Sequence, residues 1–235
     1  MEALPTPTQL VQRVHHSLLD AICSGELPAD TRLNQDSLAK RLGVSRQPIV
    51  QAIQLLKNEG FVCAMGRRGV KVAPLSAAHV RHLYQVRASL DALAAREAAL
   101  HAPDEAQRHG QTLLEAGRQA CASGQPLAMI AADMAFHRLI YRLSGNPLIE
   151  ESVATHWHHL RRAMGAVIDA SSPPRRVWEE HSDILDAVVD GDASRAERLA
   201  RQHAEQAGDA LAQRLTRYLA DFSLTAEAQK SQPDP

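Results

Sequence analysis

Residues 43–56 read GVSRQPIVQAIQLL, and this stretch decides how the N-terminal part of the chain folds. Ser45 can cap a helix by accepting a backbone N–H bond, and Pro48 then lies in the first turn, where its missing donor costs nothing. We therefore expect a helix that starts at Arg46. Its apolar residues recur at helical spacing and form one face, which consists of Ile49, Ala52, Ile53 and Leu56.

A shorter amphipathic helix, residues 35–42, precedes this one and ends at Gly43, a residue suited to the left-handed turn between two helices. Two helices joined in this way form a helix-turn-helix. The second helix presents an Arg and several amides, which suit base edges and phosphates. On this pattern alone, a helical hairpin that does not bind DNA is the alternative. The candidate DNA-binding residues of this helix are Ser45, Arg46, Gln47 and Gln51.

Further elements complete a small N-terminal domain. Residues 8–23 have the spacing of an amphipathic helix on which the helix-turn-helix can pack. Two short β-type runs, residues 61–65 and 70–73, flank a loop that contains Arg67 and Arg68, which predicts a hairpin with a cationic tip. As a wing, this tip would contact phosphates or the minor groove. A solvated turn whose arginines contact nothing is the alternative.

The remainder of the chain shows helical periodicity and no convincing strand. Clusters of Gly and Pro mark the breaks between six expected helices, at about 77–101, 103–122, 126–144, 147–170, 174–190 and 192–222. The expected fold is therefore mainly α. It combines an N-terminal winged helix-turn-helix with a small β-hairpin and a C-terminal all-α antiparallel bundle. We expect domains at residues 1–74 and 75–222, followed by a disordered tail at residues 223–235.

The composition agrees with two modest helical domains. Of 235 residues, 45% are hydrophobic and only 3% are aromatic, which favours helices over sheets. Residues 1–74 carry nine Lys and Arg against six Asp and Glu, whereas residues 75–235 carry 17 against 21, so the basic part contains the helix-turn-helix. Without a signal peptide or a long apolar run, the protein is expected in the cytoplasm, away from membranes. The free thiols of Cys23, Cys63 and Cys121 are expected to be buried or inert.

Polar residues occupy apolar stripes of the expected bundle. Asp133 and His137 lie four residues apart on one stripe, and His181 and His203 lie on the stripes of two later helices. One buried histidine is usually an ordinary core residue, but three with an aspartate are harder to explain in that way. Imidazole and carboxylate groups on facing helices suit Zn, Ni, Mn or Fe. Spacing alone does not bring the three helices together.

The N-terminal residues resemble a known family over residues 10–72. They are similar to the winged-helix domain of the GntR family of bacterial transcription regulators, which implies DNA binding. The matching segments are ICSGELP at 22–28, LGVSRQP at 42–48, EGF at 59–61 and the glycine-bearing hairpin. Two departures occur, because Pro28 is followed by Ala29 where the family has Gly, and Val50-Gln51 stands where an Arg-Glu pair is usual. The operator sequence of relatives therefore does not carry over.

Residues 77–222 resemble the FCD-type effector domain of the FadR subgroup of that family. There a D-x3-H pair and two later histidines bind a divalent metal. The resemblance implies that Asp133, His137, His181 and His203 converge on a metal ion such as Zn, Ni or Mn. Arg87 and Asp91 resemble the subgroup's R-x3-E segment, so Arg87 is either a partner for an effector carboxylate or half of a surface ion pair. One or two residues of the cluster at 156–162 are also expected to line the effector cavity.

These observations favour a metabolite-responsive transcription regulator over an enzyme. The expected protein is a homodimer that represses a metabolic operon and releases or binds double-stranded DNA in response to a small carboxylate effector. The alternative is a metalloenzyme, or a protein in which the metal is purely structural. An enzyme would need a general base near the metal, and no HExxH or similar motif supplies one.

Overall fold

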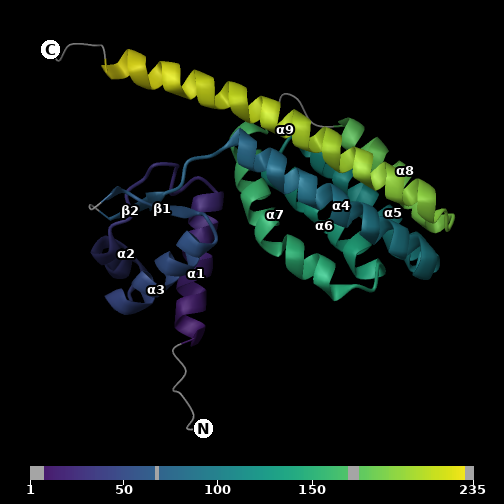
Figure 1. The fold of residues 1–235 in the computed structure, drawn as a ribbon, viewed down its shortest axis with the longest axis horizontal. Helices are drawn as coiled ribbons and strands as arrows, with labels where there is room; N and C mark the ends of the chain where they lie inside the picture. The colour runs from purple at the N-terminus through teal and green to yellow at the C-terminus, as the bar shows by residue number, and fades with distance from the viewer. Residues whose placement is uncertain (1–7, 67–68, 169–174, 231–235) are drawn as a thin grey trace, which may run out of the picture. The chain divides into compact units, whose positions relative to one another are not determined.

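The computed structural model describes residues 8–66, 69–168 and 175–230, and most of them are helical (Figure 1). The chain divides into two units, Met1–Leu75 and Ser76–Pro235. The expected fold class is confirmed: helices with a small hairpin form the first unit, and a helical bundle forms the second. Among the described residues, no helix has both the length and the apolar character that a membrane crossing requires.

In the N-terminal unit, residues 8–66 and 69–75 form three helices and a two-stranded hairpin. The helices α1 (Thr8–Cys23) and α2 (Gln35–Leu42) both pack against α3 (Arg46–Asn58). The strands β1 (Val62–Ala64) and β2 (Val70–Val72) pair antiparallel, and Arg32 adds an isolated bridge to Lys71. Together these elements enclose an apolar core that includes Leu18, Ile22, Ile49, Leu56, Phe61 and Val72.

The turn between α2 and α3 has the expected geometry. Asn34 caps α2, because its Oδ1 accepts the backbone N–H groups of Asp36 and Ser37 at 3.0 Å each. Gly43 ends the helix in the left-handed region, with φ 64° and ψ 34°, where a side chain would be strained. The predicted apolar face of α3 is buried, with Ile49 0% exposed.

The expected cap of α3 is wrong in one respect. Ser45 occupies the N-cap position, but its side chain makes no capping hydrogen bond. Pro48 is the third residue of the helix and has no N–H, so one of the two amides that usually donate to a cap is missing. The Ser45 hydroxyl is therefore exposed and available to another partner.

The described residues of the C-terminal unit form six helices. They are α4 (Ala77–His101), α5 (Pro103–Ser123), α6 (Pro126–Leu143), α7 (Pro147–Val167), α8 (Arg175–Val189) and α9 (Ala193–Lys230). Three of them begin with a proline, whose missing N–H is tolerated at that position.

Two helix ends differ from the sequence prediction. Helix α9 continues to Lys230, beyond residue 222, because residues 224–230 contain no Gly or Pro and are mostly good helix formers. Helix α7 ends at Val167, three residues before the expected end. Residues 231–235 of the expected disordered tail lie outside the described residues.

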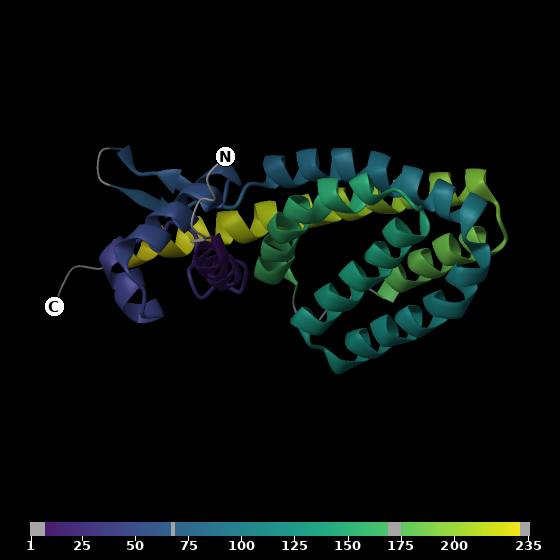
Figure 2. The same ribbon diagram turned by 90° about the horizontal axis from the view of Figure 1, so that it is seen from below.

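The long helices α4 and α9 lie side by side in both views and run in opposite directions (Figures 1 and 2). Both helices bury small residues, and a Cβ on Gly208 of α9 would lie 2.5 Å from the Cβ of Tyr84 on α4. This close approach needs the glycine. It brings Arg87 of α4 and His203 of α9 to the wall of one cavity.

The packing of α5 against α8 also depends on glycines within a helix. A Cβ on Gly117 would lie 2.0 Å from the ring of Trp178, and one on Gly110 would lie 2.3 Å from Leu185. The two large side chains are seven residues apart on α8 and rest on glycine backbone. Since His181 lies between them in the sequence, this packing also fixes the position of His181.

Candidate functional site

The polar face of α3 is exposed, as predicted. Ser45, Arg46, Gln47 and Gln51 all lie on the surface opposite the apolar core of the unit. The Arg46 Nε donates to Gln35 Oε1 at 3.1 Å, and its guanidinium lies 3.5 Å from Asp36. Both contacts orient the guanidinium at the corner of the helix-turn-helix. The predicted wing residues, Arg67 and Arg68, lie outside the described residues.

The four predicted metal ligands converge. Asp133 and His137 of α6, His181 of α8 and His203 of α9 each offer one ligand atom, and these atoms all lie within 4.8 Å of one another. The Nε2 of His181 lies 3.2 Å from Nε2 of His203 and 3.5 Å from Asp133 Oδ1. His181 is 0% exposed. The four residues therefore form a candidate metal-binding group inside the bundle.

The chemistry of this group fits a divalent cation. The Nε2 of His137 is buried and has no hydrogen-bond partner, so a polar atom that needs a partner points into the cluster. Burial lowers the pKa of His137 and His181 well below the ordinary value, and nearby Arg87 and histidine charges lower it further. Neutral imidazole is the form that binds metals. Three imidazoles and a carboxylate are a complete ligand set.

Carboxylate oxygens lie near the Nδ1 atoms of two of the three imidazoles. Glu180 Oε2 lies 2.9 Å from Nδ1 of His203, and Arg176 Nε donates to the other oxygen of Glu180 at 3.0 Å. The hydrogen bond with His203 lowers the pKa of Glu180. Asp91 Oδ2 lies 3.6 Å from Nδ1 of His137. Such carboxylates favour the tautomer with a proton on Nδ1, which leaves Nε2 free to bind a metal.

Arg87 belongs to a buried network on the same side of the bundle. Its side chain is 2% exposed, and its Nε donates to Asp91 Oδ2 at 3.1 Å. The hydroxyl of Tyr141 donates to the other oxygen of Asp91, and the guanidinium lies 4.1 Å from the ring centre of Trp157. The interpretation as a surface ion pair is therefore wrong: Arg87 and Asp91 do pair, but both are buried.

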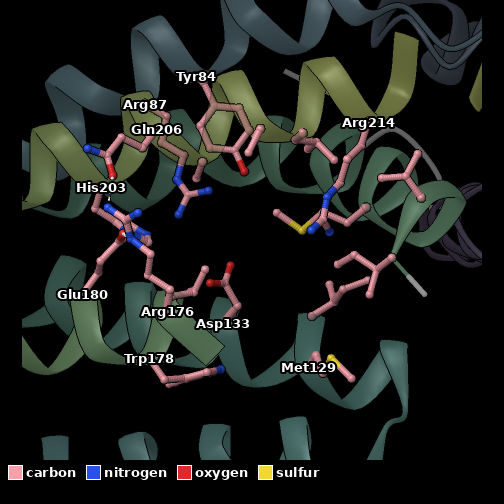
Figure 3. A pocket seen from close by; sticks show the side chains of 18 residues that line it. Tyr84, Arg87, Met129, Asp133, Arg176, Trp178, Glu180, His203, Gln206 and Arg214 are labelled. Atoms are coloured by element: carbon pink, nitrogen blue, oxygen red, sulfur yellow. Dashed lines mark hydrogen bonds and ion pairs between the residues drawn. The ribbon is translucent and has the colours of Figure 1, made fainter. Parts of the chain in front are cut away.

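A cavity of about 370 Å³ opens beside the candidate metal-binding group (Figure 3). Arg87, Asp133, His203 and Tyr84 lie on its wall. Burial raises the pKa of Tyr84 to about 12, so its phenol keeps its proton at neutral pH and can donate a hydrogen bond. Burial also raises the pKa of Asp133, and the nearby charge of Arg87 opposes this shift.

Sequence reasoning misjudged one cluster and missed two residues at this site. No residue of the cluster at 156–162 is among the described residues that line the cavity; Trp157 instead supports Arg87. Tyr84 was detectable, because it precedes Arg87 by three residues and so shares its helix face. Glu180 was not detectable from the sequence, since it lies beside His181 but on a different face of α8. Its hydrogen bond with His203 depends on how α8 packs against α9.

Comparison with known proteins supports both units. The FCD domain matches residues 82–206, and the bacterial regulatory proteins of the gntR family match residues 10–72. The chain is 31% identical to the HTH-type transcriptional regulator YdhC of Bacillus subtilis over 144 residues, 61% of this chain and 64% of that protein. It is 26% identical to the HTH-type transcriptional repressor RspR of Escherichia coli over 214 residues, 91% of this chain and 94% of that protein.

The fold also resembles a solved structure. E. coli McbR/YncC superposes with a TM-score of 0.73 and 22% sequence identity, covering 88% of this chain and 98% of that one. At this identity the likeness concerns the fold alone. The domain matches extend over both the helix-turn-helix and the helical bundle. The chain therefore belongs to the GntR family of bacterial regulatory proteins, in the FadR-like group with a C-terminal FCD domain, and is a DNA-binding transcription regulator rather than an enzyme.

Proposed function

We propose that this protein represses a metabolic operon and that a small organic acid, held at a metal site in the C-terminal unit, controls its binding to the operator. One observation carries the proposal: four ligand atoms converge beside a cavity whose wall also contains the buried cation of Arg87. The similarity to RspR, a transcriptional repressor, supports repression rather than activation by analogy. The proposed place of action is the cytoplasm, where operator DNA lies.

Asp133, His137, His181 and His203 would hold the divalent ion. Zn, Ni and Mn all accept imidazole nitrogen and carboxylate oxygen. The three histidines are buried and Asp133 is partly buried. A buried polar atom without a partner, such as Nε2 of His137, costs about 1 to 3 kcal/mol, so a shared cation would stabilise the bundle. A five- or six-coordinate ion bound there would also supply open positions for a carboxylate of the effector.

Arg87 and Tyr84 are the proposed effector-binding residues of the protein itself. The guanidinium of Arg87 lies at the cavity wall, where its charge can neutralise an anionic group, and its contact with the Trp157 ring helps to hold it there. The protonated hydroxyl of Tyr84 can donate to the same anion. Because both residues lie on α4, which begins at Ala77 directly after the N-terminal unit, an effector would act on the helix that leads to the DNA-binding unit.

The proposed DNA reader is residues 1–74, with Ser45, Arg46, Gln47 and Gln51 on the recognition helix and Arg67 and Arg68 on the wing. Residues 75–222 would bind the effector and form the dimer. Two recognition helices would then meet a roughly palindromic operator, and the effector would change their spacing.

An exposed apolar seam on α4 supports the dimer. Val86, Leu93 and Leu100 are 49%, 36% and 53% exposed and follow one another at intervals of seven residues, the repeat that aligns a helix face for a partner helix. A second copy of the chain would cover this seam. In sedimentation velocity, Leu93→Glu should shift the wild-type dimer toward monomer, whereas Leu127→Glu, at an exposed position of α6, should not. A monomeric wild type would contradict this part of the proposal.

Metal content and effector response test the whole proposal. Protein purified without a His tag or chelator should contain about one ion per chain by elemental analysis. In a thermal-shift screen, one class of organic acid should raise the melting temperature only when Zn, Ni or Mn is present. At a hundredfold excess over Kd the effector contributes about 2.7 kcal/mol, or roughly 5 to 10 °C. A metal ratio near zero that added ions do not restore would overturn the proposal.

A purely structural metal is the second candidate, since the group ties three helices together. It would show as metal-free protein that melts earlier but responds to the same acids and binds the same DNA.

A further inference from the structure

The cavity in the C-terminal unit is polar at one side and apolar along most of its wall. Asp133, His203 and Arg87 lie at the polar side, next to Arg176 and Glu180 (Figure 3). The apolar wall comes from helices α6, α7, α8 and α9 and from the residue after α7, and it includes Met129, Ile130, Met164, Val167, Ile168 and Leu211. Such a wall excludes water and favours a ligand with an aliphatic body.

A further cation lies on the other side of the cavity. The side chain of Arg214 extends from α9 into the cavity, away from His203 (Figure 3). The two other arginines among the described wall residues have carboxylate partners, since Arg87 pairs with Asp91 and Arg176 with Glu180. Arg214 is half-buried and forms no ion pair or side-chain hydrogen bond with any described residue. A guanidinium held against an apolar wall gains most from a bound anion.

Helix geometry sets the separation of the two polar sides. His203 and Arg214 are eleven residues apart on α9, which is about three turns, so both project from nearly the same face. Their Cα atoms are therefore about 16 Å apart along the helix axis. An acid of two or three carbons bound beside His203 would not reach Arg214. A ligand that uses both cations must be elongated.

We infer that the effector is an elongated dianion with an aliphatic body, a linear dicarboxylate of medium chain length. One carboxylate binds at the metal site and Arg87, the methylene chain lies along the aliphatic wall, and the second carboxylate binds Arg214. This inference rests on the proposed function, because it takes the first carboxylate to bind beside Asp133 and His203. To the proposed function it adds three points: the effector has a second anionic group, the effector is elongated, and Arg214 selects for both features.

The test compares matched acids on full-length, metal-loaded protein by calorimetric titration. The probes are the dicarboxylates succinate, adipate and suberate, with the monocarboxylate octanoate as the match for suberate. The wild type should bind suberate at least about tenfold more tightly than octanoate, the gain of one charge-assisted hydrogen-bonded pair. Arg214→Gln should reduce this ratio to near one and leave octanoate binding unchanged. Arg214→Lys should retain part of the preference, because it keeps the charge.

Arg217→Gln is the matched control, since it removes one positive charge from an exposed position of the same helix. It should keep the wild-type preference. The inference is overturned if the wild type binds octanoate as tightly as suberate, or if Arg214→Gln still prefers suberate while its melting temperature shows that it is folded. If no acid binds to the metal-loaded wild type, the proposed function fails as well. Octanoate binding distinguishes the two failures, because octanoate still binds when only the inference about the second carboxylate is wrong.

Discussion

The two units place their polar groups in opposite locations. Among the described residues, every buried polar side chain belongs to the C-terminal unit, including Arg87, Asp91, His137, His181 and His203. In the N-terminal unit the buried cluster is apolar and the polar side chains of α3 are exposed. One unit thus has a core that needs no ligand. The other has a core that contains polar groups, and among them Nε2 of His137 and Nδ1 of His181 have no hydrogen-bond partner.

The two units should respond differently when a polar residue is replaced. A polar residue on the surface of α3 can be removed with little effect on folding, because water solvates the exposed site. Under the proposed function, a polar residue of the metal site would contribute both to folding and to binding. Substitutions in the two units should therefore differ in their effect on the free energy of unfolding.

Replacing a metal ligand should destabilise the C-terminal unit most. At a metal concentration a thousandfold above Kd, binding contributes about 4 kcal/mol to the free energy of unfolding. His181→Ala should remove this contribution and lower the melting temperature by roughly 10 °C. Calorimetry and elemental analysis on the same sample measure both losses.

His101→Ala is the control for this substitution, because His101 is exposed in the last turn of α4. It should change neither metal content nor melting temperature. If His181→Ala binds no metal yet melts like the wild type, the core of the C-terminal unit does not depend on a cation, and the contrast between the units fails.

Acid should destabilise the metal-free protein through the same histidines. Because the pKa of His137 and of His181 is lowered in the folded state, the unfolded chain binds more protons at mildly acidic pH. Stability should therefore rise with pH and be lost as pH falls below about 6.5, by about 1.4 kcal/mol per pH unit for each histidine.

Urea unfolding of chelator-treated protein between pH 7.5 and pH 5.5 measures this slope. His181→Gln should reduce the slope by about 1.4 kcal/mol per pH unit, the contribution of one proton, because a glutamine side chain does not titrate. An unchanged slope in this variant would assign the pH dependence to other groups.

Removing the recognition-helix arginine should affect only DNA binding. Arg46→Ala should weaken binding about tenfold or more, because an Arg contact to a base edge contributes about 1 to 3 kcal/mol. The melting temperature should stay within error, since the side chain is 63% exposed. Fluorescence anisotropy with a duplex selected from a random pool by the wild type provides the measurement.

Arg108→Ala, at an exposed position of α5, controls for the loss of one positive charge. It should bind the selected duplex like the wild type. Equal weakening by both substitutions would mean that net charge, rather than the face of α3, controls the affinity.

The sequence predicted most helices because Gly and Pro mark their ends and apolar spacing marks their faces. It also placed Asp133 and His137 on one face, since four residues make about one turn. It did not bring His181 and His203 to them, because packing between helices depends on contacts such as that of Trp178 with Gly117. Only the resemblance to a family supplied that step.

The missing cap at α3 gives the smallest predicted effect and the closest comparison. A serine at an N-cap normally contributes about 1 kcal/mol, but Ser45 makes no capping hydrogen bond. Ser45→Ala should therefore change the urea midpoint very little, while DNA binding weakens a few-fold because the exposed hydroxyl can contact a phosphate.

Asn34→Ala is the matched variant, since Asn34 does cap α2 through two hydrogen bonds. It should cost about 1 kcal/mol. If both substitutions destabilise the protein equally, the Ser45 hydroxyl caps α3 in solution and belongs to the fold rather than to the DNA-binding surface.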